Sequence, residues 1–291
     1  MKNNEFFKYN DIILKKMSVF LNCEPDFVTA DIINELCSEF SVSEEEAFSF
    51  ILAAEIGLDV EENARDREIF ELYFPKMIKK LNIEDFSNDP YLNEVKIPEK
   101  ACGRWEFKLE KYKPYEAFAC NDLLSLPDGR VIPQIGFFDS EFSYSAVLEG
   151  GREWMLITPN EINTMANPIA CARGKVLTYG LGLGYFAFMA ARKEEVLSVT
   201  VVEKERAVIE LFEKYIRPSL SCAEKIEIVC DDAFDFAENK MSEGKYDFVF
   251  ADIWHDPSDG VSAYKRFKSL EYKLPCAEFS YWIEDTIKCY L

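Results

Sequence analysis

The feature that most constrains this chain is an alternation of short apolar runs with helical segments in its C-terminal part. The apolar runs are rich in β-branched and aromatic residues and occur at 176–179, 199–202, 226–229 and 246–251. Segments with helical patterning separate them, at 185–191, 205–216 and 233–241. Strands that alternate with helices at this spacing form βαβ units. The pattern therefore predicts an α/β fold with a parallel sheet covered by helices.

The first 98 residues are predicted to form a helical domain. Apolar residues recur every three to four positions between 12 and 40, which is the spacing of one helix face. Ser43 followed by Glu46 has the pattern of a capping box at a helix start. A further helix is expected from Ala64 to Leu81, with Pro75 as a kink or break.

The pattern of residue types changes in the middle of the chain. Residues 82–100 are predicted to be a linker, because prolines interrupt them and no periodicity survives. From Trp105 onward, aromatic and charged residues alternate with the period of a half-buried strand, and glycine-containing turns follow. The predicted domains are a helical domain at 1–98, a small antiparallel β element at 101–158 and a parallel α/β domain at 159–291.

The charge balance narrows the classes of ligand. The chain has 33 basic and 53 acidic residues and a formal net charge of −20. Binding to nucleic acid needs lysine and arginine to displace phosphate counterions, so we expect no nucleic-acid partner. An acidic chain is also a poor match for an anionic membrane surface. We expect a small-molecule substrate, neutral or cationic.

The cysteine and histidine content points to a reducing environment. Nine cysteines are present without a CxxC pair, together with a single histidine. We therefore expect free thiols, a cytoplasmic location and no metal site. No leader peptide and no transmembrane segment is recognisable in the sequence.

Chemically capable residues follow the predicted strands at their carboxyl ends, where open parallel sheets bind ligands. A glycine loop follows the first strand, Glu203 the second, an acidic pair the third, and an acidic loop the fourth. These are Gly180-Leu181-Gly182-Leu183-Gly184, Glu203-Lys204, Asp231-Asp232-Ala233 and Asp252-Ile253-Trp254-His255-Asp256. Glycines allow a tight turn and close approach of a ligand, and an acid such as Glu203 can accept hydrogen bonds from ribose hydroxyls.

These motifs resemble the successive motifs of class I S-adenosylmethionine-dependent methyltransferases, and within that superfamily they are most similar to the spermidine-synthase-like branch. The resemblance covers about 155–260 and implies a Rossmann-like domain that binds S-adenosylmethionine. It implies that Gly180, Gly182 and Gly184 face the methionyl part and ribose and that Glu203 binds the ribose hydroxyls. It also implies that Asp232 with Ala233 meets the adenine and that Asp252 faces the transferred group. The flanking Tyr179, Lys204 and Asp231 complete the predicted cofactor-binding set.

The chain departs from the family in three places. Thr178 stands where many methyltransferases carry an acid, and the 252–257 loop lacks the small hydroxyl residues of spermidine synthases. Only 38 residues follow Ile253, which is too few for the three further strands of a full methyltransferase sheet. We therefore expect a shortened sheet whose missing edge is exposed or covered by a partner subunit in a homodimer.

The leading hypothesis is a methyltransferase for a small molecule or a protein. Asp252 or His255 would act as catalytic residue by orienting or deprotonating an amine or hydroxyl. The alternatives are an aminopropyltransferase and a non-catalytic nucleoside-binding or interaction protein. Residues 182–187 also satisfy the GxGxxA form of dinucleotide-binding proteins. Purely structural roles stay open as well, such as helix capping by Asp231 or Asp232.

Overall fold

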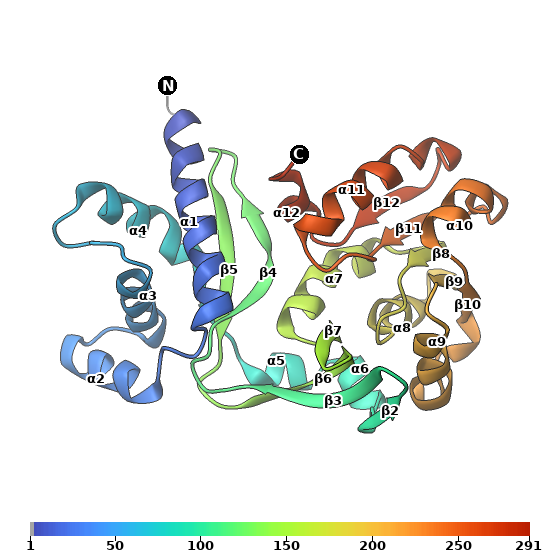
Figure 1. Ribbon diagram of the computed structural model, residues 1–291, viewed down its shortest axis with the longest axis horizontal. Helices are drawn as coiled ribbons and strands as arrows, with labels where there is room; N and C mark the ends of the chain where they lie inside the picture. Colours follow the sequence, from blue (N-terminus) through green and yellow to red (C-terminus); the bar gives the residue numbers. More distant parts are fainter. Residues whose placement is uncertain (1–2) are drawn as a thin grey trace. The chain divides into compact units, whose positions relative to one another are not determined.

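The computed structural model describes residues 3–291, which fold into two compact units. Figure 1 shows the course of the chain through both units. The first comprises the chain up to Ile83 together with Lys111–Ser143, and the second comprises Glu84–Glu110 and Tyr144–Leu291. The units therefore interleave along the sequence, and the β-rich middle of the chain contributes to both.

The first unit combines four helices with a three-stranded sheet. The helices are α1 (Asn3–Cys23), α2 (Ala30–Phe40), α3 (Glu44–Glu55) and α4 (Ala64–Met77). The sheet has the order β1-β5-β4, formed by β1 (Ile78–Lys80), β5 (Val131–Phe137) and β4 (Phe118–Ser125). The Phe48 and Phe137 rings stack with their centroids 4.3 Å apart and join helix α3 to strand β5.

Local signals in the first unit act largely as predicted. The Ser43–Glu46 capping box forms at the start of α3, because each side chain accepts from the other residue's backbone. Helix α4 passes through Pro75 and ends two residues later at Met77, and β1 begins at the next residue, so the predicted continuation to Leu81 was wrong. A short edge strand takes those residues instead, because they pair in parallel with β5.

The second unit is built on a parallel sheet in the order β10-β9-β8-β11-β12. Its strands are β8 (Gly174–Tyr179), β9 (Val196–Glu203), β10 (Ile226–Cys230), β11 (Phe248–Ala251) and β12 (Glu278–Tyr281). Every neighbouring pair is parallel. This confirms the Rossmann-like α/β fold with a shortened C-terminal sheet.

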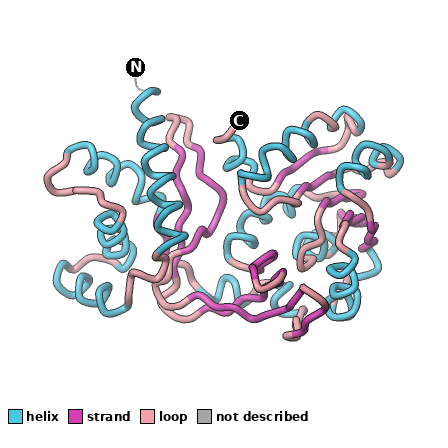
Figure 2. Tube along the Cα trace, in the orientation of Figure 1, coloured by secondary structure: helices cyan, strands magenta, loops and turns pink. Residues whose placement is uncertain are grey.

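Helices separate the strands of this sheet, as Figure 2 shows along the trace. The α-helices are α7 (Pro159–Cys171), α8 (Tyr185–Ala191), α9 (Arg206–Leu211), α10 (Ala233–Asn239), α11 (Pro257–Lys268) and α12 (Glu284–Lys288). Five short turns complete the set: the π-helical η1 (Phe212–Ile216) and the 3₁₀ turns η2 (Arg217–Ser219), η3 (Ala223–Lys225), η4 (Met241–Glu243) and η5 (Glu271–Lys273).

Four antiparallel strands also belong largely to the second unit. They are β2 (Lys100–Cys102), β3 (Trp105–Tyr112), β6 (Phe142–Glu149) and β7 (Arg152–Leu156), in the order β2-β3-β6-β7. The single β element predicted at 101–158 is thus two sheets, because β4 and β5 pair with β1 in the first unit instead. Alternation identifies a strand but not its partner, so the sequence could not divide the two sheets.

The predicted linker also contains structure. Helices α5 (Ile83–Ser87) and α6 (Pro90–Glu94) lie within it. Asp89 caps α6 by accepting from the backbone of Tyr91 and Leu92, and Tyr91 is buried in the core of the second unit. The Tyr91 hydroxyl donates to the carbonyl of Leu183, and the Tyr185 hydroxyl donates to Asp89 Oδ2 at 2.8 Å. The segment thus packs against the glycine loop.

Among the helices that the structure describes, none is both long and apolar enough to cross a bilayer.

Candidate functional site at the carboxyl edge of the parallel sheet

The register of the parallel sheet brings the predicted site residues to one edge. Tyr179, the last residue of β8, pairs with Val202 of β9 on one side and with Ala251 of β11 on the other. The residues that follow these positions, Gly180, Glu203 and Asp252, therefore leave the sheet at the same level. Strand order reverses between β8 and β11, which is the kind of switch point where open α/β sheets bind ligands.

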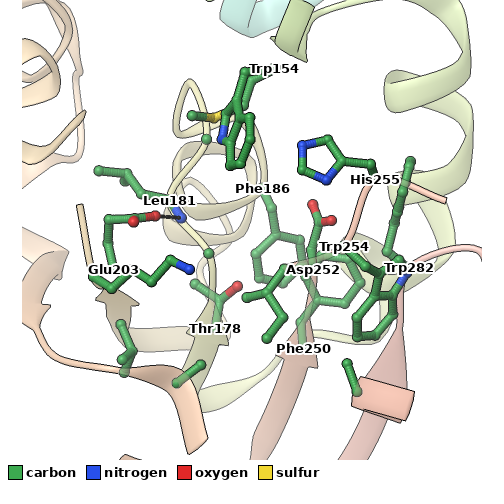
Figure 3. A pocket seen from close by; sticks show the side chains of 18 of the residues that line it. Trp154, Thr178, Leu181, Phe186, Glu203, Phe250, Asp252, Trp254, His255 and Trp282 are labelled. Atoms are coloured by element: carbon green, nitrogen blue, oxygen red, sulfur yellow. Dashed lines mark hydrogen bonds between the residues drawn. The ribbon is translucent and has the colours of Figure 1, made fainter. Parts of the chain in front are cut away.

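A cavity of about 780 Å³ opens at this edge, and all of its lining residues belong to the second unit. Its size falls within the roughly 300–1,000 Å³ of small-molecule and cofactor sites. Figure 3 shows Leu181 and Glu203 on one side of it and Asp252, His255, Trp254 and Trp282 on the other. We call these the glycine-loop side and the carboxyl side.

The glycine loop after β8 is shaped by close packing. Gly180 has φ +96°, and a Cβ there would lie 2.0 Å from the carbonyl oxygen of Asp252. Gly182 has φ +55°, and its nearest neighbour would be the flexible Met155 Sδ at 3.3 Å. Gly180 is therefore required by the fold itself, whereas Gly182 leaves its backbone bare toward a ligand.

Glu203 ties the end of β9 to this loop. Its Oε2 accepts from the backbone N–H of Leu181 at 3.1 Å, and its Oε1 accepts from that of Glu205 at 2.8 Å. Figure 3 draws the first of these bonds. Each carboxylate oxygen has two lone pairs, so both keep capacity for a hydroxyl donor from a ligand. The neighbouring Lys204 is exposed and also lines the cavity.

Asp232 and Ala233 line the same side of the cavity from the start of α10. Asp232 Oδ1 caps the helix by accepting from Phe234 N at 2.9 Å and from Asp235 N at 3.1 Å. Within residues 3–291, no group donates a hydrogen bond to Oδ2. The side chain thus has the structural role of a cap and still leaves one oxygen for a ligand.

Three predicted cofactor contacts do not line the cavity. Tyr179 is fully buried, and its ring packs 4.8 Å from that of Phe267, because successive strand residues point to opposite faces. Gly184 packs instead against Phe212, whose ring would lie 2.3 Å from a Cβ there. Asp231 forms an ion pair with Lys240 at 2.7 Å, which lowers its pKa. These three residues shape the site from behind, which corrects the predicted set.

The carboxyl side contains a pair of acids from separate elements, Asp252 after β11 and Glu161 in the first turn of α7. Burial raises the pKa of Asp252 to about 7. The pKa of Glu161 is raised well above its usual value by burial and by the negative charge of Asp252. Among the described residues, none donates a hydrogen bond to either carboxyl side chain. Burial and mutual repulsion thus both disfavour the ionised forms of these two carboxyl groups.

Aromatic residues line the same cavity as this pair. Trp254 and Trp282 are almost fully buried, whereas Trp154 is 37% exposed. The imidazole of His255 meets the Trp154 ring edge-on, with centroids 4.2 Å apart, and its Nδ1 lies 3.3 Å from Asp259 Oδ2. In Figure 3 the Asp252 carboxyl group points toward the side occupied by His255. Both predicted catalytic residues, Asp252 and His255, thus line the cavity.

Sequence reasoning missed Glu161 and the aromatic residues Trp154 and Trp282. Thr158 and Glu161 have capping-box spacing, which suggests only a helix start. Thr158 does accept from the Glu161 backbone at 3.5 Å, but the Glu161 side chain lines the cavity instead of returning to the cap. Because Glu161 and Asp252 lie 91 positions apart, no local spacing could have joined them.

The described part of the chain contains no group of three or more histidine, cysteine or acidic side chains arranged to hold a metal ion.

Comparison with solved structures shows similarity of fold only. The chain is similar to the crystal structure of spermidine synthase from Thermotoga maritima, with a TM-score of 0.36 and 16% identity, over 48% of this chain and 52% of that one. It is also similar to the cofactor-bound structure of Rv0187 from MTB, with a TM-score of 0.29 and 21% identity, over 37% of this chain and 48% of that one. The chain thus spans about half the length of these structures. No family model and no curated protein matches it.

Proposed function

We propose that this protein is an S-adenosylmethionine-dependent methyltransferase whose acceptor binds beside Asp252. One observation carries the proposal: a single cavity extends from Gly182 and Glu203 on the glycine-loop side to Asp252 and Glu161 on the carboxyl side. A nucleoside donor and an acceptor would lie end to end in such a cavity. The acceptor would be a small molecule or a protein side chain, not a nucleic acid.

The residues of the glycine-loop side fit a nucleoside. Gly182 has no side chain to fill the space that it borders. The Glu203 oxygens are held in position by two backbone donors and can each accept from a ribose hydroxyl. Asp232 Oδ2 can accept from an exocyclic amine, and the small side chain of Ala233 borders the same space. The fit therefore rests on a bare backbone and on carboxylate oxygens with remaining capacity.

The carboxyl side fits the needs of an acceptor. The bound cofactor would supply an electrophilic methyl group on a sulfonium, so the protein has to position a nucleophile, exclude water and remove a proton. Trp254 and Trp282 are buried and line the same cavity as the pair, so they supply apolar surface to it. Asp252, with its pKa raised to about 7, is matched to accepting a proton near neutral pH.

Two other functions remain as competing proposals. An aminopropyltransferase would use the same nucleoside contacts, and the products distinguish the two reactions. Methyl transfer leaves S-adenosylhomocysteine, whereas aminopropyl transfer from the decarboxylated cofactor leaves methylthioadenosine. A non-catalytic nucleoside-binding protein would bind the cofactor and release neither product.

Calorimetry on the full chain with S-adenosylmethionine and S-adenosylhomocysteine tests the proposal. We expect both to bind, and we expect Glu203→Gln to weaken binding about tenfold, because charge-assisted hydrogen bonds to the ribose are lost. Asp231→Asn is the matched control, since Asp231 pairs with Lys240 outside the cavity lining. Absence of binding by the unaltered chain at millimolar ligand, or equal loss in both variants, would contradict the proposal.

A further inference from the structure

The acids on the carboxyl side divide into those that are satisfied and those that are not. Asp256 caps α11 by accepting from Ser258 N at 2.6 Å. Asp259 accepts from the backbone N–H groups of His255 and Asp256, each at 3.2 Å. Glu161 and Asp252 receive no hydrogen bond from any residue in the described range. They are thus the acids of this side that are free to bind a ligand.

The charges around the pair favour a cation as that ligand. The cavity is lined by seven acidic residues against two basic ones, Lys204 and Arg266, beside the single histidine. Arg266 is paired with Glu238 at 2.6 Å, and Lys204 adjoins Glu203 on the glycine-loop side. An ammonium group carries three donors, so one ammonium could bond to both Glu161 and Asp252 and stabilise their ionised forms.

The residues that line the cavity around the pair limit where a ligand could carry a second charged group. Trp154, Phe186, Trp254 and Trp282 line the same cavity as the two carboxyl groups. Aromatic faces attract ammonium groups and cover apolar substituents. A linear diamine would need a second free acid further along its chain. Of the other acids on this side, Asp259 is bound in the α11 cap, and Glu153 is exposed, where solvent screens its charge.

We infer that the acceptor is a monoamine with an apolar, aromatic body, held through its ammonium by Glu161 and Asp252 against the tryptophan walls. This inference rests on the proposed methyl transfer and adds the substrate class. The ammonium first gives a proton to the carboxylate pair, which frees the nitrogen lone pair. A nitrogen–carbon bond then forms as the carbon–sulfur bond breaks, and its electron pair stays on sulfur, which becomes neutral. The N-methylated amine is the product.

Calorimetry with three matched probes tests the substrate class on the full chain saturated with S-adenosylhomocysteine. The probes are 2-phenylethylamine, the neutral 2-phenylethanol, and 1,4-diaminobutane. We expect 2-phenylethylamine to bind at least tenfold more tightly than either of the others. Glu161→Gln and Asp252→Asn should each reduce that affinity at least tenfold, with unchanged affinity for S-adenosylhomocysteine.

Glu153→Gln is the control, because Glu153 is an exposed acid of the same cavity lining. Its amine affinity should stay within twofold. Tighter binding of 1,4-diaminobutane or of 2-phenylethanol, absence of amine binding, or unchanged affinity in both pair variants would overturn the inference. Thermal unfolding of Glu161→Gln and of Asp252→Asn checks that each of these two variants is folded. Failure of S-adenosylhomocysteine to bind would instead reject the proposed function, so the two failures are distinguishable.

Discussion

The two sides of the cavity use the same type of side chain in opposite ways. On the glycine-loop side, Glu203 and Asp232 each accept hydrogen bonds from backbone donors of the described chain. On the carboxyl side, Glu161 and Asp252 have no such donors, and the pKa of each is raised by burial. A carboxylate with backbone donors is a rigid acceptor for neutral hydroxyls, whereas an unpaired, partly buried carboxyl group is suited to proton transfer. The proposed function assigns ligand binding to Glu203 and Asp232, and proton transfer to Glu161 and Asp252 in the same cavity.

The largest expected effect follows from removing the proton acceptor of the carboxyl side. Asp252→Asn should reduce turnover about 100-fold to 10,000-fold, because a positioned general base contributes about that much. The nucleoside affinity should change little, since Asp252 lies across the cavity from Glu203. Single-turnover release of S-adenosylhomocysteine measures the rate. An unchanged rate would remove Asp252 from the chemistry.

On the glycine-loop side, substitutions of two glycines of the loop can be compared. Gly180→Ala should lower the free energy of unfolding by about 3 kcal/mol, because its Cβ would meet the Asp252 carbonyl oxygen at 2.0 Å. Gly182→Ala should cost only about 1 kcal/mol, for its positive φ, yet weaken nucleoside binding more than it weakens the fold. Urea unfolding and calorimetry measure the two effects. Equal destabilisation by both substitutions would show that the packing around Gly180 is not decisive.

The raised pKa of Asp252 predicts a pH dependence of stability. Burial raises it from 3.8 to about 7, so the folded chain keeps a proton that the unfolded chain releases above about pH 4. This group therefore makes stability fall as pH rises from about 4 to 7. Between pH 4 and pH 7.5 the free energy of unfolding of Asp252→Asn should rise by about 3 to 4 kcal/mol relative to that of the unaltered chain. Urea unfolding at both pH values measures this gain, and a constant difference would contradict a raised pKa.

The smallest effect is expected at His255. Its side chain is 43% exposed and packs against Trp154, while the carboxyl pair, with its raised pKa values, is better suited to hold the proton. His255→Ala should reduce turnover about tenfold, at the weak end of acid–base effects. It should also shift the fluorescence of Trp154, the partner of the lost ring. A loss as large as that of Asp252→Asn would transfer the role of base to His255.

Sequence reasoning reached the features that depend on local order. Alternating strands and helices gave the parallel sheet, and strand ends in register brought Gly180, Glu203 and Asp252 to one edge. Features that depend on distant contacts were not predictable. Glu161 comes near Asp252 only through the packing of α7. Tyr91 bonds to the glycine loop, and Asp89 to Tyr185 at the start of α8, only because α6 folds against them. Tyr179 and Asp231 were predicted as cofactor contacts but do not line the cavity, because adjacency to a motif does not give the direction of a side chain.

A crystal structure of the full chain with S-adenosylhomocysteine tests the central claim most directly. The account predicts that the nucleoside occupies the glycine-loop side, with its ribose hydroxyls on Glu203 and its adenine beside Asp232 and Ala233. The sulfur should face Asp252 and Glu161. A nucleoside bound elsewhere, or one whose sulfur points away from these two carboxyl groups, would contradict it.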